Sequence, residues 1–308
     1  MQVLDLSEAP RPATGVVVAT GDHTAPNAEF WLEHATFTLT EAPTDDRRIV
    51  VVPSVSDTLT QLQERTQRWP QAAAMCDDVL RTVDTSAPAL RGVIIESLAY
   101  STLQSGPEFA CWLATRGPAA PVALADPVLV ERDGDVLRVR FNRPQRHNAF
   151  STDARAALLD ALAVAQLDDS ITGVVLSGNG KSFCSGGDLA EFGTFADPAT
   201  AHLARTRHSP ALALDELTHR LGAACRAEVH GQVLGSGLEM AAYCGQVTCA
   251  PDAVLGLPEL ALGLIPGAGG TVSITRRIGR WRTAYLVLTG HTIRPATALS
   301  WGLVDRVC

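Results

Sequence analysis

The chain has 308 residues, of which 46% are hydrophobic and 19% charged, and its formal net charge is −8. This is the composition of an ordinary globular protein with one large or two modest domains. The acidic balance and the absence of a Lys/Arg run argue against nucleic-acid or anionic-membrane binding. No apolar run approaches 18 residues and no leader pattern opens the sequence, so we expect a cytoplasmic protein.

The seven cysteines are dispersed and include no Cys-x-x-Cys pair. Their odd number suits a reducing cytosol. No histidines and cysteines have the spacing of metal ligands, so we expect no metal site.

The first 127 residues divide by composition into three segments. Residues 1–54 form a short β-rich segment, 55–118 have apolar residues at helical spacing between prolines, and 119–127 are a linker rich in proline and small residues. Within these segments we expect strands at 15–20, 35–40 and 48–52, and helices over 57–68, 71–82, 87–103 and 106–115.

The remaining residues, 128–308, alternate strands with helices and predict an α/β fold. A hairpin of 128–132 and 136–141 opens this part, because Asp133-Gly134-Asp135 separates two apolar runs. Further strands are expected at 173–177, 227–229, 246–250 and 254–256, and helices over 152–166, 198–225, 274–288 and 295–301. In such folds function gathers at the carboxyl ends of the strands.

The glycine-rich stretch 229–242 is the first candidate site. Its glycines allow a tight turn directly before a helical pattern. Amide N–H groups at a helix N-terminus favour an anion, either a phosphate or an oxyanion formed during a reaction. The stretch lacks the dinucleotide and P-loop fingerprints, and no Gly-x-Ser-x-Gly motif surrounds Ser236 or Ser185. Taken alone, it is equally explained by close packing of a helix on a strand.

A second turn of small residues, 181–189, follows the strand expected at 173–177. Two such turns can each direct one backbone N–H at a single carbonyl oxygen, which makes an oxyanion hole. Cys184 is a weak candidate nucleophile because no partner histidine is evident. Asp188 fits a helix-capping or structural role better than a catalytic one.

Two glutamates are the candidates for proton transfer. Glu239 lies in the first turn of the helix that follows the glycine-rich stretch, and Glu259 is a lone carboxylate in an apolar run. Taken alone, Glu259 is better explained as an exposed loop acid. Burial among leucines would instead raise its pKa toward the range useful for proton transfer, and the pair could then hold one water.

Four ordered motifs between about residues 128 and 307 resemble those of the crotonase (enoyl-CoA hydratase/isomerase) superfamily. They are Asn142-Arg143-Pro144-x-x-x-Asn148-Ala149, Phe183-Cys184-Ser185-Gly186-Gly187-Asp188-Leu189, Gly231-x-x-x-Gly235-x-Gly237-x-Glu239, and Pro258-Glu259 with Leu264-Ile265-Pro266-Gly267-Ala268-Gly269-Gly270-Thr271. The resemblance implies the superfamily's α/β fold, a superhelix of ββα units.

The resemblance also implies the site. The N–H groups of Gly187 and Ser236 would bind an acyl-CoA thioester oxygen, although the superfamily usually has glycine where Ser236 stands. Glu239 would orient or deprotonate a water, and Glu259 would exchange the proton at the α-carbon. The resemblance also implies that no cofactor is needed beyond the coenzyme A of the substrate.

Binding of coenzyme A is implied for a second group of residues. The backbone around Ser185 and Leu189 would meet the adenine. Arg146 or Lys181 would meet the phosphates, and the alternative for both is a solvated loop side chain.

The chain departs from the superfamily at its C-terminal side. Members continue past the segment matching Gly302-Leu303-Val304-Asp305 into helices that cover the coenzyme A site and build a trimer or a dimer of trimers. Here residues 51–116 are similar to that tail, including Glu96-Ser97-Leu98-Ala99-Tyr100. We expect a circular permutation, which is tolerated where termini lie close together at the surface. The alternative is an unrelated helical appendage.

The resulting prediction is a hydratase-type lyase acting on a 2-enoyl-CoA. An enoyl-CoA isomerase, an acyl-CoA hydrolase and an aromatic-acyl-CoA enzyme of the same fold remain alternatives. A catalytically silent acyl-CoA-binding subunit is an alternative of a different class. The fold alone does not decide between them.

Overall fold

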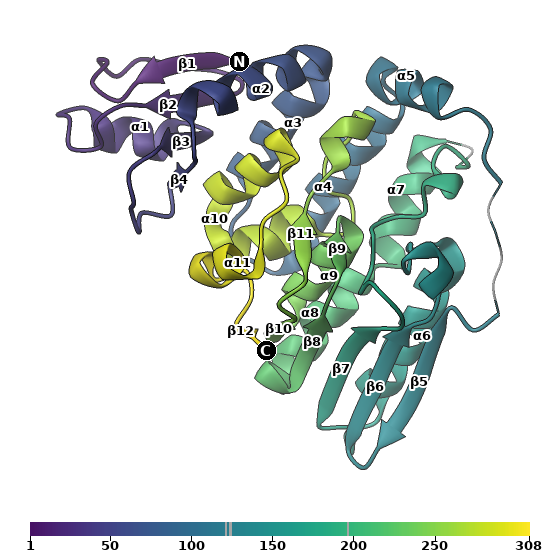
Figure 1. The fold of residues 1–308 in the computed structure, drawn as a ribbon. Coiled ribbons are helices and arrows are strands. Elements are labelled where there is room, and N and C mark those ends of the chain that lie inside the picture. The colour runs from purple at the N-terminus through teal and green to yellow at the C-terminus, as the bar shows by residue number, and fades with distance from the viewer. Residues whose placement is uncertain (121, 123–124, 196) are drawn as a thin grey trace.

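The computed structural model describes residues 1–120, 122, 125–195 and 197–308. Figure 1 shows a sheet at the base of the molecule, a central group of helices, and a second, smaller sheet formed by the N-terminal residues. The mixture of helices and largely parallel strands confirms the α/β prediction. No helix in the described ranges is both long and apolar enough to span a bilayer.

The main sheet has six strands in the order β12-β10-β8-β7-β6-β5. Only β5 and β6 are antiparallel, because the Asp-Gly turn joins them directly, with Gly134 at φ 62°. A separate parallel pair, β9 and β11, lies beyond the main sheet. The strands are β5 (Val128–Asp133), β6 (Val136–Phe141), β7 (Gly173–Gly178), β8 (Cys225–Val229), β9 (Gln232–Leu234), β10 (Gln246–Cys249), β11 (Val254–Gly256) and β12 (Arg306–Val307). Strands β9 and β12 were not predicted.

Helices follow the strands and carry the residues of the site. They are α6 (Thr152–Leu167), α7 (Pro198–Arg207), α8 (Pro210–Leu221), α9 (Ser236–Tyr243), α10 (Gly270–Thr289) and α11 (Pro295–Trp301). Single 3-10 turns occur at η1 (Pro144–Arg146), η2 (Leu189–Glu191), η3 (Gly222–Ala224) and η4 (Glu259–Leu262). The one helical region predicted over 198–225 is two helices, because Ser209 caps a new helix through a hydrogen bond from the Leu212 N–H.

The N-terminal residues form a small parallel sheet of their own. Its strands run in the order β1 (Gln2–Asp5), β2 (Val17–Thr20), β3 (Phe37–Thr40) and β4 (Ile49–Val51), and one helix, α1 (Ala28–His34), packs on it. Trp31 is fully buried in the core between them. The sequence did not predict β1, which buries only Leu4, or α1, which is seven residues long and has no side-chain cap.

Four helices follow, close to the predicted positions: α2 (Val55–Arg68), α3 (Pro70–Thr82), α4 (Ala89–Gln104) and α5 (Pro107–Arg116). Helices α2, α3 and α4 pack against α10, and α4 also packs against α7. The contact between α4 and α10 is close, since a Cβ on Gly92 would lie 2.4 Å from Val272. Residues 55–116 therefore cover the core formed by 128–308.

The position of these helices bears on the circular permutation. They lie on the core, as the permutation requires, and Arg65 Nε donates to the Leu288 carbonyl of α10 at 2.9 Å. In Figure 1, however, the C-terminal end lies well apart from α2. The permutation stays a proposal. The predicted linker over 119–127 includes residues 121, 123 and 124, which lie outside the described residues.

Candidate active site

A cavity of about 330 Å³ lies where the main sheet meets the helices. Its walls come from the turn 185–189, the start of α9, η4 and the loop 267–269, with α4 and α7 on the remaining side. Cavities of this size are typical of small-molecule sites. Six of the seven predicted site residues line it, namely Ser185, Gly187, Leu189, Ser236, Glu239 and Glu259.

The first turn places Gly187 in the wall of the cavity. The neighbouring residues are fixed by backbone hydrogen bonds, since Phe150 donates to the Gly186 carbonyl at 2.8 Å and Asp188 donates to the Phe150 carbonyl at 2.9 Å. The Gly187 N–H donates to no other group in the described part of the chain. A Cβ here would lie 2.8 Å from the Phe192 ring, so the turn is built for glycine.

The second turn lies beside the first. The Cys184 N–H donates to the Gln232 carbonyl at 3.1 Å, and the Leu234 N–H donates to the Cys184 carbonyl at 3.0 Å. Ser236 then opens α9, and its N–H, like that of Gly187, has no acceptor among the described residues. The Ser236 Oγ is also buried without a hydrogen-bond partner in the described chain. Two unused amides thus border one cavity.

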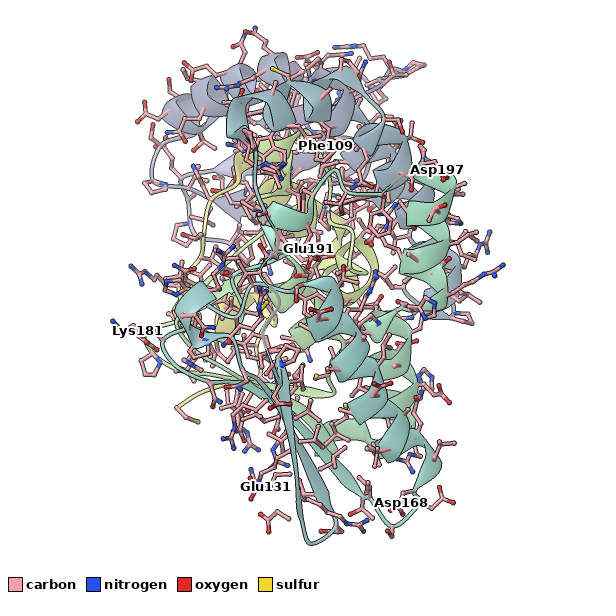
Figure 2. The ribbon with its side chains drawn as sticks, turned by 90° about the vertical axis from the view of Figure 1, so that its right-hand side faces the viewer. Phe109, Glu131, Asp168, Lys181, Glu191 and Asp197 are labelled. Atoms are coloured by element: carbon pink, nitrogen blue, oxygen red, sulfur yellow. The ribbon has the colours of Figure 1, made fainter. Side chains whose placement is uncertain are left out.

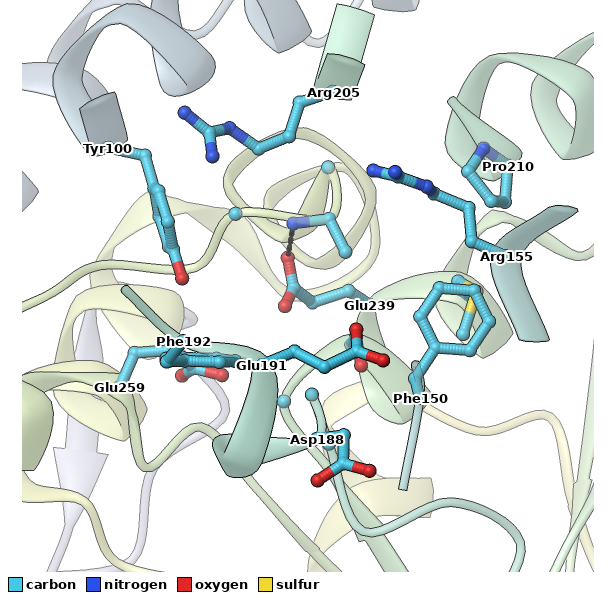
Figure 3. A pocket seen from close by; sticks show the side chains of 18 of the residues that line it. Tyr100, Phe150, Arg155, Asp188, Glu191, Phe192, Arg205, Pro210, Glu239 and Glu259 are labelled. Atoms are coloured by element: carbon cyan, nitrogen blue, oxygen red, sulfur yellow. Dashed lines mark hydrogen bonds between the residues drawn. The ribbon is translucent and has the colours of Figure 1, made fainter. Parts of the chain in front are cut away.

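Glu239 lies in the first turn of α9 and is 2% exposed. Its Oε2 accepts hydrogen bonds from the N–H groups of Ala268 at 2.7 Å and Gly270 at 2.8 Å, the first of which is drawn in Figure 3. Burial raises the pKa of Glu239 well above its usual value, and the charges of Glu259 and Glu96 raise it further, whereas the two N–H donors oppose the rise.

Glu259 begins η4 and is 8% exposed, so it is buried and the interpretation as an exposed loop acid is wrong. Its Oε2 is buried and has no hydrogen-bond partner among the described residues. Burial raises the pKa of Glu259 to about 8. The side chain fits because Gly235, at φ 47°, carries no Cβ, which would lie 2.5 Å from Glu259 Oε1.

Only some of the residues predicted to bind coenzyme A lie at the cavity. Arg146 does not line the cavity and instead pairs with Asp188 at 3.2 Å. The Ser185 N–H donates to the His147 carbonyl at 3.0 Å, and the Leu189 carbonyl accepts from Arg116. Figure 2 shows Lys181 at the outer edge of the molecule, and its side chain is exposed. Ser185 and Leu189 therefore line the cavity, whereas Arg146 and Lys181 do not.

Asp188 has the structural role that the sequence indicated. It caps η2 by accepting from the Ala190 N–H at 3.2 Å and pairs with the buried Arg143 at 2.9 Å. Burial raises the pKa of the Cys184 thiol to about 12, which is unfavourable for a nucleophile. Within the described residues, no group of three or more histidine, cysteine or acidic side chains is placed to hold a metal ion.

Comparison with known proteins agrees with this geometry. Residues 131–308, more than half of the chain, match the family model described as enoyl-CoA hydratase/isomerase. The chain belongs to the enoyl-CoA hydratase/isomerase family. Its function is accordingly of the acyl-CoA hydratase/isomerase type, and the resemblance read from the four motifs is confirmed.

Two curated relatives and one solved structure illustrate this family membership. A probable enoyl-CoA hydratase of Mycobacterium bovis is 36% identical over 182 residues, which are 58% of this chain and 68% of the relative. The 2,3-dehydroadipyl-CoA hydratase of Escherichia coli is 34% identical over 180 residues, with the same coverage of 58% and 68%. The crystal structure of the Thermoplasma volcanium enoyl-CoA hydratase has a TM-score of 0.51 at 31% identity and covers 60% of this chain and 72% of that one.

Glu96 was not predicted to have a role, although it lines the same cavity of this enoyl-CoA hydratase/isomerase family member. Glu96 is 1% exposed on α4. Its carboxylate accepts from the N–H groups of Gly269 at 2.7 Å and Thr271 at 2.9 Å, and from the Thr271 hydroxyl at 2.7 Å. Burial raises its pKa to about 7. Its position in an apolar helical run was the available signal, since an isolated buried carboxylate requires partners.

Replacing Glu96 by leucine is expected to lower the free energy of unfolding by about 2–4 kcal/mol, because three buried donors at the start of α10 lose their acceptor. Thermal unfolding followed by circular dichroism measures the change. Glu64→Leu on the exposed face of α2 is the matched control and is expected to change stability by less than about 0.5 kcal/mol. Equal losses from the two variants would contradict the anchoring role of Glu96.

Proposed function

We propose that this protein adds water to the 2,3-double bond of a 2-enoyl-CoA, the reaction of a hydratase-type lyase. The observation that carries the proposal is that Glu239 and Glu259 are buried in the same cavity as the unused amides of Gly187 and Ser236. A pair of amides suits a thioester oxygen that becomes negative, and a pair of acids suits proton transfer at two adjacent carbons.

In the proposed reaction, Glu239 accepts a proton from water while the water oxygen forms a bond to C3 of the substrate. The electrons of the double bond move toward the carbonyl, so negative charge develops on the thioester oxygen beside the two N–H groups. Glu259 then donates its proton to C2, and the enolate returns to a thioester. One water has been added across the double bond, and the proton on Glu239 is later returned to Glu259 or solvent.

The surroundings of the two acids support this division of roles. Glu239 accepts two backbone hydrogen bonds from other residues, which favour its anion, whereas Glu259 Oε2 has no donor among the described residues and only the backbone N–H of Glu259 itself favours its anion. Two buried carboxyl groups in one cavity also disfavour simultaneous ionisation. Burial raises the pKa of both carboxyl groups, and the charge of Glu259 adds to the rise at Glu239 only while Glu259 is ionised. We therefore assign a proton to Glu259 at neutral pH and the charge to Glu239.

Hydration of crotonyl-CoA, followed by loss of the absorbance of its conjugated double bond, tests the proposal. The rate is expected to fall above about pH 8, because Glu259 loses the proton that it must donate. The rate is also expected to fall at low pH, where Glu239 becomes protonated. A rate that keeps rising through pH 9 would contradict the assignment of Glu259 as the acid.

A product other than the hydrated acyl-CoA would indicate one of the alternative functions. Migration of the double bond without loss of the acyl-CoA would indicate an isomerase, and release of free coenzyme A would indicate a hydrolase. Binding of acyl-CoA with no turnover on a broad panel would indicate a silent binding subunit. Each of these results would contradict hydration as the main activity.

Several finer expectations rest on the family resemblance. We propose coenzyme A, carried by the substrate, as the only cofactor, a cytoplasmic location, and assembly as a trimer or a dimer of trimers. Light scattering coupled to size-exclusion chromatography measures the assembly state. The proposed roles of Ser185 and Leu189 in adenine binding, and of Arg146 toward phosphate, can be measured through the affinity for free coenzyme A.

A further inference from the structure

Two arginine side chains line the cavity without an ion-pair partner. Arg155 comes from the first turn of α6 and Arg205 from α7. Figure 3 shows Arg155 extending toward the middle of the cavity and Arg205 lying along its far side, next to Tyr100. Neither guanidinium lies within 4.0 Å of a carboxylate of the described residues. The family motifs include neither residue.

The two arginines differ in how they are held. Arg205 is fixed by neutral groups of α4, since it donates to Ser97 Oγ at 3.1 Å and to Gln104 Oε1 at 3.1 Å. Its guanidinium carbon also lies 4.6 Å from the centre of the Tyr100 ring. The Arg155 side chain makes no hydrogen bond to any residue that the structure describes, and it lines the cavity.

Neither guanidinium is paired with a carboxylate of the described residues, although acidic groups lie near both. Burial lowers the pKa of Arg205, Tyr100 and the charge of Glu96 oppose this, and the charge of Arg155 lowers it further. Burial also lowers the pKa of Arg155, while the charge of Glu191 opposes this. One oxygen of Glu191 is already used by the N–H and hydroxyl of Thr152, at 2.7 and 2.8 Å. A pair of partly buried cations is stabilised when an anion joins it.

The position of the pair indicates which part of a substrate meets it. If the thioester oxygen lies at Gly187 and Ser236, the acyl chain continues past Glu239 into the rest of the cavity. Figure 3 places Arg155 and Arg205 on the side of Glu239 opposite to Asp188 and its turn. The arginines therefore lie beyond the reacting carbons, at the acyl end.

We propose that Arg155 and Arg205 bind a carboxylate at the far end of the acyl chain, so that the preferred substrate is an enoyl-CoA derived from a dicarboxylic acid. This inference rests on the proposed hydratase function, because that function fixes the direction of the acyl chain. Arg155 supplies free donors, and Arg205 supplies charge from a fixed position. An uncharged chain would leave both guanidinium groups without a paired carboxylate.

The test compares two six-carbon substrates that differ only at the chain end: 2,3-didehydroadipyl-CoA, which ends in a carboxylate, and 2-hexenoyl-CoA, which ends in a methyl group. The wild-type protein is expected to have a kcat/KM at least about 30-fold higher for the first, as a charged hydrogen bond in a partly buried site provides. Arg155→Met should remove most of this preference, and Arg155→Lys should retain part of it.

Binding of the saturated analogues gives a readout that does not depend on turnover. Adipyl-CoA is expected to bind the wild-type protein more tightly than hexanoyl-CoA in isothermal titration calorimetry, and Arg155→Met should abolish the difference. Arg207→Met, on the exposed face of α7, is the matched control and should preserve it. Arg155 is preferred to Arg205 for substitution because the hydrogen bonds of Arg205 join α7 to α4.

A phosphate of coenzyme A is the other anion that an acyl-CoA could offer to this pair. In that case Arg155→Met would weaken adipyl-CoA and hexanoyl-CoA equally, and the loss would vanish with pantetheine thioesters; this result would overturn the proposal. Equal wild-type kcat/KM for the two enoyl substrates would also overturn it while leaving hydration intact. Failure of hydration itself is recognised separately, as absence of turnover on both substrates despite the difference in binding.

Discussion

Glu259→Gln and Glu239→Gln are each expected to lower kcat for hydration by about 10²–10⁴-fold, the usual contribution of a positioned acid or base. Glutamine keeps the size of each side chain, and at position 239 its carbonyl oxygen can still accept from the Ala268 and Gly270 N–H groups. The loss therefore reports proton transfer and not packing. Steady-state rates with crotonyl-CoA give the measurement.

Two comparisons sharpen this prediction. The double variant should be little slower than the slower single variant, because both acids serve one reaction. Glu108→Gln is the matched control, since Glu108 also accepts two backbone N–H groups, from Gln71 at 2.7 Å and Ala72 at 3.1 Å, but does not line the cavity. Full hydration activity in both single variants would rule out the acid pair.

Ser236→Pro is expected to lower kcat by about 10²–10³-fold, because proline has no N–H to offer the thioester oxygen. Ser236 is the first residue of α9, a position where the fixed φ of proline suits a helix. Gly235, at φ 47° and ψ −125°, has an extended conformation of mirror-image hand, which only glycine adopts easily and which leaves room for a following proline ring.

The controls for this substitution keep the amide. Ser236→Gly and Ser236→Ala remove the hydroxyl, which has no partner among the described residues, and should be far less damaging than proline. Thermal unfolding of all three variants separates misfolding from loss of the donor. Similar losses from alanine and proline would show that the Ser236 amide does not bind the substrate oxygen.

Much of the fold could be predicted because its signals are local. The Asp-Gly turn fixed the β5–β6 hairpin, and prolines marked the starts of α3 and α5. The start of α10 was predicted four residues too late, at 274 instead of Gly270. The first N–H groups of this helix are bound by Glu96 and Glu239, which are distant in sequence, so no local pattern marks the boundary.

In the candidate site, too, local motifs could be predicted, but contacts between distant residues could not. The glycines and glutamates of the two turns could be located because motif spacing preserves them, and the structure places them around one cavity. Arg146 was expected near coenzyme A, but it is drawn to Asp188, a preference that spacing does not reveal. Glu96, Arg155 and Arg205 were missed because their importance depends on three helices meeting at one point.

The bonds from Glu96 to Gly269 and Thr271 join residues 173 and 175 positions apart. During synthesis, α3 and α4 therefore leave the ribosome long before α10, against which they pack. At ordinary elongation rates this interval is roughly 10–35 s. The apolar faces that pack on α10 have to remain uncovered for that time. The cavity can therefore form only after α10 has been synthesised. A nascent chain released early would expose those faces to aggregation or to a chaperone.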